Sequence, residues 1–233
     1  MQIAIMQPYF LPYIGYFQLI NAVDIFVLYD NIEFTKKGWI NRNRYLMNGE
    51  AKYFTIPLKK DSDFLDINQR VLSDTWPKEK GKILNKISEA YRNAPFHTSA
   101  MHLVKEIFDF ESVNLFDFNL NAIRKICALL DVSTPIVISS ALETNRDFKK
   151  EKRVLDICQT LNASSYINPI GGVDLYDKFE FKANGIKLSF LKTADFKYNQ
   201  GTENFTSHLS ILDILMHNDL GKIKCQLKEF DLI

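Results

Sequence analysis

The sequence predicts an α/β fold, a Rossmann-like three-layer sandwich with a mostly parallel sheet and a helical insertion. Two short apolar runs, Ile3–Met6 and Ile25–Tyr29, have the length and composition of buried strands. Between them, Pro12–Ala22 carries apolar residues at helical spacing, which makes a compact βαβ unit. Such units form parallel sheets, and a hydrophobic content of 46% is enough for a sizeable core.

The next part of the chain departs from this alternation. Residues 31–50 are polar and aromatic, and Asn48-Gly49 lies between two segments typical of hairpin strands. After a loop over residues 59–75, helical patterns occur near 77–93, 99–110 and 115–131. We therefore expect a single α/β domain over residues 1–233 with a helical insertion over residues 77–131.

Strands and helices alternate again after the insertion. The expected strands are Pro135–Ser139, Ser165–Asn168 and Ile186–Leu191, and the expected helices are Arg146–Leu161, residues 173–183, and a helix from a cap at Ser207 to Asn218. This order puts the first strand at the centre of the sheet. Its carboxyl end is then a topological switch point, where open α/β sheets bind their ligands.

The composition argues against several classes of protein. The net charge is +1, from 29 basic and 28 acidic residues, so we expect no nucleic acid or anionic membrane surface as a partner. No apolar run approaches the ~20 residues of a membrane span, and no basic leader precedes the first strand. Three dispersed cysteines and four unpaired histidines predict free thiols, buried at Cys127 and Cys158, a reducing cytoplasm and no structural metal site.

The segment after the first strand is the first candidate site. Gln7–Tyr16 holds two prolines and three tyrosines, which is more than a strand-to-helix connection requires. Ligands of open sheets bind where a strand ends and the next helix begins. The candidate binding residues here are Gln7, Pro8, Tyr13, Gly15 and Tyr16, although Gly15 could equally serve close packing of the helix on the sheet.

The same segment carries a resemblance to the WbqC-like protein family. The blocks that resemble the family are Met6–Ile20, Asp24–Asp30, Trp39–Asn43, Tyr91–Phe96, Tyr166–Gly172, Tyr198–Gln200 and Leu209–Asp213. They extend over the whole chain. The resemblance implies a place in bacterial O-antigen, or lipopolysaccharide, biosynthesis, and a role in transferring glycine or another aminoacyl group to a sugar.

Tyr13-Ile14-Gly15-Tyr16 also resembles a motif of nucleotidylyl transferases and class I synthetases. Those enzymes have His-x-Gly-His at the start of the first helix, where the glycine lets the nucleotide lie close and the imidazoles stabilise phosphate charge. Here the glycine is kept, but both histidines are tyrosines, which are neutral at pH 7. The difference argues against adenylyl transfer, and we expect Tyr13 and Tyr16 to act through hydrogen bonds and shape.

Polar residues around the end of the second strand form another candidate site. Asp30 closes an apolar strand, where a carboxylate can hold an amine, bind a hydroxyl, act as a base, or simply cap a turn. In the following loop, an aromatic face and an arginine between two amides suit a sugar with a carboxylate or diphosphate. The loop candidates are Lys37, Trp39, Asn41, Arg42 and Asn43; the alternative is a solvated basic loop anchored by its tryptophan.

Later segments contribute further candidates. His97 follows Pro95, which we expect to end a helix, so it should lie in a loop as an acid, a base or a solvent-exposed residue. Ser139 and Ser140 follow a strand at a position where nucleotidylyl transferases often carry phosphate-binding serines. The remaining candidates, Tyr166, Gly172, Tyr198 and Gln200, lie in the family-like blocks.

These observations predict a cytoplasmic transferase that acylates the amino group of a nucleotide-linked amino sugar. The candidate catalytic residues are Asp30, His97 and Gln7: the first two would deprotonate or orient the amine. Arg42 with Lys37 would hold phosphate. Gln7, with Tyr13 and Tyr16, would bind the transferred group.

The expected partners are a nucleotide sugar and an acyl donor, and a homodimer is left open. We expect no tightly bound cofactor, although a nucleotide substrate can bring magnesium with it. The alternatives are an ATP-dependent ligase or nucleotidylyl transferase with a degenerate His-x-Gly-His motif, and a non-catalytic sugar-binding protein.

Overall fold

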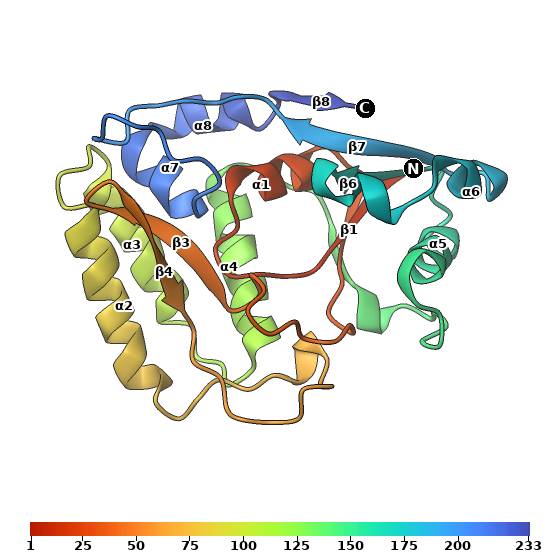
Figure 1. Cartoon of the computed structure of the whole chain (residues 1–233), viewed down its shortest axis with the longest axis horizontal. Helices are drawn as coiled ribbons and strands as arrows, with labels where there is room; N and C mark the ends of the chain where they lie inside the picture. Colours follow the sequence, from red (N-terminus) through yellow and green to blue (C-terminus); the bar gives the residue numbers. More distant parts are fainter.

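A six-stranded, mostly parallel sheet lies at the centre of the computed structural model, which describes residues 1–233 (Figure 1). The strand order is β5-β2-β1-β6-β7-β8, and only β8 is antiparallel to its neighbour. The strands are β1 (Gln2–Met6), β2 (Ile25–Leu28), β5 (Ile136–Ile138), β6 (Ser165–Pro169), β7 (Lys187–Thr193) and β8 (Phe230–Leu232). This topology confirms the predicted Rossmann-like α/β fold.

β1 occupies the middle of the sheet because it is apolar on both faces. Ile3 and Ala4 are completely buried and Ile5 is 4% exposed, as expected for a strand covered by helices on both sides. β1 pairs with β2 on one side and with β6 on the other. Its carboxyl end is therefore the topological switch point that the sequence predicts.

Helices cover both faces of the sheet. Along β1, Ile3 and Ile5 point into a core of 13 buried residues shared with α5 and α6, whereas Ala4 points into a core of 48 buried residues shared with α1, α7 and α8. The helices are α1 (Ile14–Asn21), α5 (Lys150–Thr160), α6 (Lys178–Ala183), α7 (Ile211–His217) and α8 (Leu220–Gln226). The result is the expected three-layer arrangement.

A hairpin and three helices extend the larger core. β3 and β4 pair antiparallel through Asn48 and Gly49, whose φ angles of 53° and 77° suit a tight hairpin turn. Their bounds and those of the three helices are β3 (Arg42–Met47), β4 (Glu50–Thr55), α2 (Trp76–Ala90), α3 (His97–Phe108) and α4 (Leu115–Leu129). Their apolar side chains join the 48-residue core, which supports the proposal of one α/β domain with a helical insertion.

Short elements and the cysteines complete the description. Three 3-10 helices, η1 (Ile67–Gln69), η2 (Ser139–Ala141) and η3 (Ile170–Leu175), connect the larger elements. Cys127 and Cys158 are buried as predicted, and burial raises the pKa of each thiol to about 12. None of the helices combines the length and apolar character needed to cross a bilayer.

The structure differs most from the expectation near the C-terminus. α7 begins after Ser210, whose hydroxyl accepts a hydrogen bond from the Leu212 N–H, and not after Ser207. α8 and β8 are additional elements, too short to show a clear period in the sequence. Elsewhere, His97 is the first residue of α3 and does not lie in a loop.

Candidate functional site

Asp30 follows β2 and places a buried carboxylate at the carboxyl edge of the sheet. Its side chain is 1% exposed. Oδ1 accepts hydrogen bonds from the Ser139 hydroxyl at 2.8 Å and the Ser140 N–H at 2.9 Å, and Oδ2 accepts one from the Asn68 amide at 2.7 Å. No ion pair involves Asp30. Three neutral donors therefore offset the cost of burying this charge.

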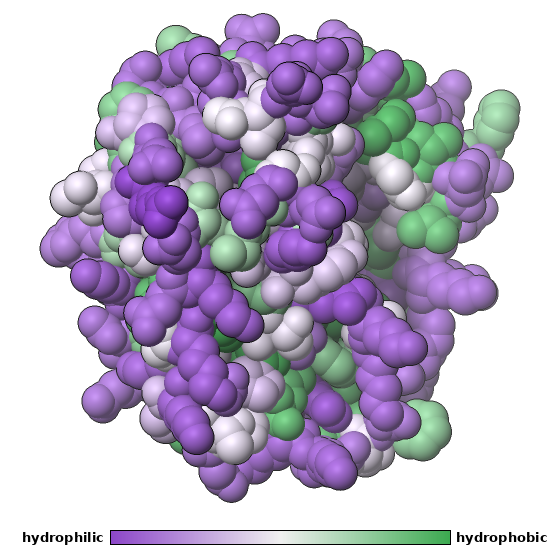
Figure 2. Space-filling model, turned by 60° about the vertical axis from the view of Figure 1, so that its left-hand side comes forward, coloured by the Kyte–Doolittle hydropathy of each residue, from purple (hydrophilic) through white to green (hydrophobic).

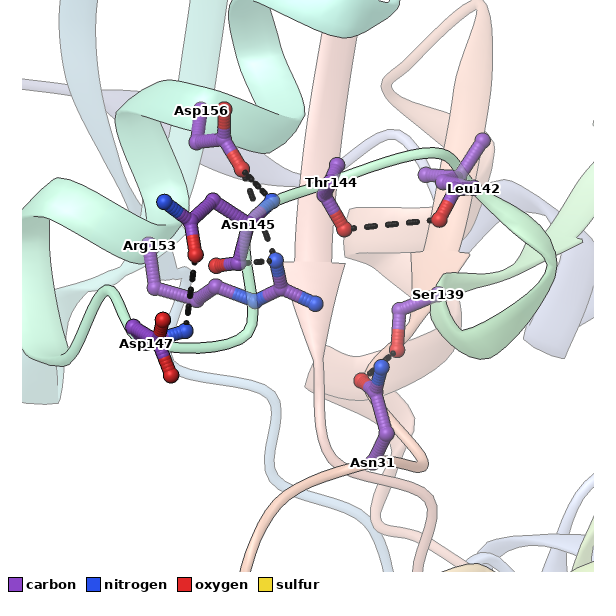
Figure 3. A network of polar contacts seen from close by, with 8 residues as sticks. All are labelled: Asn31, Ser139, Leu142, Thr144, Asn145, Asp147, Arg153 and Asp156. Carbon is purple, nitrogen blue, oxygen red and sulfur yellow. Dashed lines mark hydrogen bonds and ion pairs between the residues drawn. The ribbon is translucent and has the colours of Figure 1, made fainter.

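Ser139 and Ser140 reach Asp30 because β5 pairs in parallel with β2, with Ile138 opposite Leu28. The Ser139 hydroxyl also lies 2.6 Å from Oδ1 of Asn31, as Figure 3 shows. A hydroxyl has one proton, so it can donate to only one of these acceptors at a time. A bound group could thus replace one acceptor without leaving Ser139 unpaired.

Basic side chains lie around the same edge. Burial raises the pKa of Asp66, while Arg146 and Lys149 lower it and Asp30 raises it, so each of these three groups lies within electrostatic reach of Asp66. Arg146 and Lys149 are exposed. The edge therefore combines a buried negative charge with accessible positive charge.

Arg153 from α5 is a second buried charge near this edge. Its side chain is 2% exposed, and Nη1 donates to the Asn145 carbonyl at 2.8 Å and reaches Asp156 at 3.4 Å. Nη2 has no hydrogen-bond partner, and in Figure 3 it points towards Asn31 and Ser139. Burial raises the pKa of Tyr29, the last residue before Asp30, and the nearby Arg153 opposes that rise.

Gln7 leaves the sheet at the same edge as Asp30. The Tyr29 N–H donates to the Met6 carbonyl at 2.8 Å, so these neighbouring strands end side by side. The Gln7 carbonyl accepts a hydrogen bond from the Tyr16 hydroxyl at 3.1 Å, and its half-buried side-chain amide remains available to a ligand. Tyr16 is 2% exposed, and burial raises its pKa well above its usual value, so it supports the Gln7 backbone as a neutral donor.

Gly15 makes room for the ring of Tyr13. A Cβ atom at position 15 would lie 2.4 Å from that ring, which folds back over the start of α1. The Tyr13 ring thus fills the space above Gly15. In a His-x-Gly-His enzyme, the nucleotide occupies the corresponding space. Tyr13 instead lines a cavity of about 410 Å³ together with Thr193 and His208.

A double-mutant cycle tests this role of Gly15. Gly15→Ala should destabilise the wild-type protein because of the clash with Tyr13. In a Tyr13→Ala background the same change should stabilise by up to about 1 kcal/mol, because alanine forms helix better than glycine. Urea unfolding measures both free energies. Equal effects in the two backgrounds would show that Gly15 serves some other contact.

The basic loop after β2 uses many of its polar groups internally. Arg42 donates through Nε to the Gly38 carbonyl at 2.9 Å and through Nη2 to the Lys37 carbonyl, and its guanidinium lies 4.9 Å from the Tyr53 ring. Trp39 is 44% exposed and stacks on Tyr53. The binding of an anion by Arg42 with Lys37 stays a prediction.

Two amides, Asn41 at the end of this loop and Asn43 on β3, hold neighbouring backbone. Asn43 donates to the carbonyls of Phe10 at 3.1 Å and Leu11 at 2.7 Å, which fixes the segment after β1. Pro8 in that segment is buried. Asn41 donates to the Ile56 carbonyl at 2.8 Å. These side chains shape the loops and are already occupied.

The remaining candidates lie in three other places. Tyr166 is buried within the sheet and stacks on Phe181, and Gly172 leaves space for the Asn168 side chain. His97 lies 3.1 Å from the Ser88 hydroxyl and lines a cavity of about 950 Å³ beside α2 and α3. Tyr198 and Gln200 both bond to the carboxylate of Asp213. The structure therefore brings together Asp30, Gln7, Ser139 and Ser140, and leaves His97 elsewhere.

Sequence reasoning missed three polar residues at the edge. Asn31 lies in a loop and Asn68 in the short 3-10 helix η1, neither of which shows a regular sequence pattern, so only tertiary contact identifies them. Arg153 did leave a signal, because it precedes Ile157 by four residues and so lies on the apolar face of its helix. No three His, Cys, Asp or Glu side chains are grouped closely enough to hold a metal ion.

The fold and the edge define a class: a Rossmann-like α/β protein with polar groups gathered at the carboxyl ends of its central strands. Residues 7–225 match the model of the WbqC-like protein family, and the chain belongs to that family. It is 29% identical over 219 residues to the uncharacterized protein Rv1507c of Mycobacterium tuberculosis, covering 93% of each chain. No solved structure matches it.

Proposed function

We propose that the chain transfers an acyl group, glycyl or another aminoacyl group, to the amine of a nucleotide-linked amino sugar during the synthesis of a bacterial surface polysaccharide. The observation that carries this proposal is the buried Asp30 carboxylate at the switch-point edge, which has three neutral donors and no cationic partner. A protonated amine is the ligand that such a charge attracts most strongly. The family membership favours the same pathway.

The neighbouring groups suit the rest of such a substrate. Arg146 and Lys149 are exposed near Asp66, where they can meet the diphosphate of a nucleotide sugar. The Gln7 amide is available to the carbonyl of the acyl donor. The amine and the diphosphate of one substrate can then be held at the same edge of the sheet.

The reaction requires the loss of two protons from the ammonium nitrogen and one exchange of bonds. Asp30 takes a proton from the bound ammonium group, and the free amine attacks the acyl carbon. A carbon–nitrogen bond forms and the bond between the acyl carbon and its leaving group breaks. The nitrogen then loses its second proton to the leaving group, and the proton held by Asp30 passes to solvent. Positioning of the two reactants supplies much of the rate enhancement.

Mass spectrometry of the sugar tests the proposal. The purified chain is incubated with a panel of nucleoside-diphosphate amino sugars and with amino acids supplied either as thioesters or with ATP. We expect the mass of one amino sugar to rise by one aminoacyl residue. The matched sugar that carries a hydroxyl in place of the amine should remain unchanged and should bind less tightly.

The other outcomes separate the alternatives. Product that forms only with ATP would identify a ligase, whereas transfer of a nucleotidyl group would identify a nucleotidylyl transferase. Tight binding of nucleotide sugar without any change in mass would indicate a sugar-binding protein. If no member of the panel binds or reacts, the proposal is wrong.

A further inference from the structure

A further cavity, separate from those beside Tyr13 and His97, lies where three loops meet. Its volume is about 760 Å³. In Figure 1 the tip of the β3–β4 hairpin, the connection between α2 and α3, and the loop before α7 converge at the upper left. The side of the molecule that carries α2 and the hairpin, brought forward in Figure 2, is mostly hydrophilic. The surroundings of this cavity therefore favour a polar ligand over an apolar one.

Behind the wall of this cavity lies the carboxylate of Asp213, which is 0% exposed. Oδ1 accepts a hydrogen bond from the Tyr91 hydroxyl at 2.9 Å. Oδ2 accepts from the Tyr198 hydroxyl at 2.6 Å and from the Gln200 amide at 2.7 Å. These donors come from the end of α2 and from the loop before α7, so one carboxylate joins three segments of the chain.

The negative charge of Asp213 has no cationic partner. No ion pair includes it. Burial raises the pKa of Tyr91 and Tyr198, and the charge of Asp213 raises it further. Burial lowers the pKa of His217, one helical turn further along α7, although Asp213 opposes that change. Tyr91, Tyr198 and His217 therefore do not neutralise the negative charge of Asp213, which acts on the cavity across its wall.

The lining of the cavity matches this charge. Tyr91, Gln200 and His217 form the part of its wall nearest to Asp213. No lysine or arginine lines it, and Glu203 adds a second negative charge at the surface. The remaining polar lining consists of amides and a hydroxyl, from Asn48, Asn93, Asn199, Asn204 and Thr202. By contrast, the cavity beside Tyr13 is lined by one residue of each charge, Asp195 and Lys197.

We propose that this cavity binds a small protonated amine that also carries hydroxyl groups. The uncompensated charge of Asp213 attracts the ammonium group, and the amides around it accept and donate hydrogen bonds to the hydroxyls. The site is distinct from the edge around Asp30 and does not depend on the proposed transferase activity. Asp213, the buried carboxylate of this site, takes no part in the proposed acyl transfer.

A matched pair of probes tests the proposal in the unmodified full chain. 2-Amino-1,3-propanediol and glycerol differ only in an ammonium group against a hydroxyl. Titration of ¹⁵N-labelled protein at pH 7 should give chemical-shift changes at Asn93, Gln200 and His217, with the amine binding at least about tenfold more tightly than glycerol. Equal affinities, or changes confined to residues around Asp30, would overturn the proposal.

Variants separate the contributions of the two carboxylates. Asp213→Asn should weaken binding of the amine by about tenfold and leave binding of glycerol unchanged. Glu203→Gln should weaken binding of the amine less, because Glu203 is exposed. Asp30→Asn should leave the chemical-shift changes at Asn93, Gln200 and His217 unchanged with either probe. If Asp213→Asn does not fold, Glu203→Gln and the probe pair still decide the question. Unchanged amine binding in a folded Asp213→Asn variant would contradict the role of Asp213.

Discussion

Asp30→Asn is expected to lower the rate of acyl transfer by about 10²–10⁴-fold, the range found for loss of a general base. Asparagine has the same shape and can still accept from the Ser140 N–H, but it carries no charge and takes no proton from an amine. The expected loss is therefore in kcat and in amine recognition together. Steady-state kinetics with the amino sugar found in the product assay measure it.

Two controls keep this result interpretable. Asp174→Asn removes an exposed carboxylate and should leave the rate unchanged. Urea unfolding of Asp30→Asn should remain cooperative, which separates a chemical defect from a folding defect. A folded Asp30→Asn variant with wild-type rate would show that the carboxylate only anchors the turn at Ser139.

Phe10→Ala is expected to lower the free energy of unfolding by about 3–5 kcal/mol, the cost of removing a large buried aromatic side chain. Phe10 is completely buried, although it lies in the loop between β1 and α1. Its ring lies 5.8 Å from Phe54, 5.5 Å from Phe108 and 5.4 Å from Phe118, measured between ring centroids. It thereby joins the N-terminal loop to the hairpin and to α3 and α4.

The matched control is Phe64→Ala. Phe64 is 82% exposed, so its loss should change the free energy of unfolding by no more than about 0.5 kcal/mol. Chemical denaturation followed by circular dichroism measures both variants. A loss below about 1 kcal/mol for Phe10→Ala would mean that the aromatic cluster can repack around the cavity.

The sheet could be predicted because its strands are encoded locally. Ile3–Met6 and Ile25–Tyr29 are apolar, short and flanked by turn residues, and the structure has strands there within a residue or two. The hairpin followed from Asn48-Gly49 for the same reason. The three residues of β8, near the C-terminus, show no such pattern, because their strand structure depends on pairing with β7.

The candidate site could be predicted only in part, because most of its contacts join distant segments. Asp30 and Ser139 are 109 residues apart, and they meet because β2 pairs in parallel with β5. The sequence marked each of them as a candidate but did not predict their contact. Asn68 comes from the short 3-10 helix η1, whose position no local pattern specifies. The aromatic residues of the first loop likewise gave no sign of whether they faced a ligand or the core, and Phe10 faces the core.

The hydrogen bonds that complete the N-terminal loop also bear on how the chain acquires its structure during synthesis. The Ser210 hydroxyl donates to the Leu11 carbonyl, 199 residues earlier, and the Ile211 N–H donates to the Pro12 carbonyl. β1 also waits for β6 before both of its edges are paired. At about 5–20 residues per second, the ribosome needs about 10–40 s to make the 199 residues from Leu11 to Ser210. The first residues to leave the ribosome are thus among the last to reach their final contacts, and in the meantime the apolar N-terminal segment is exposed to chaperones.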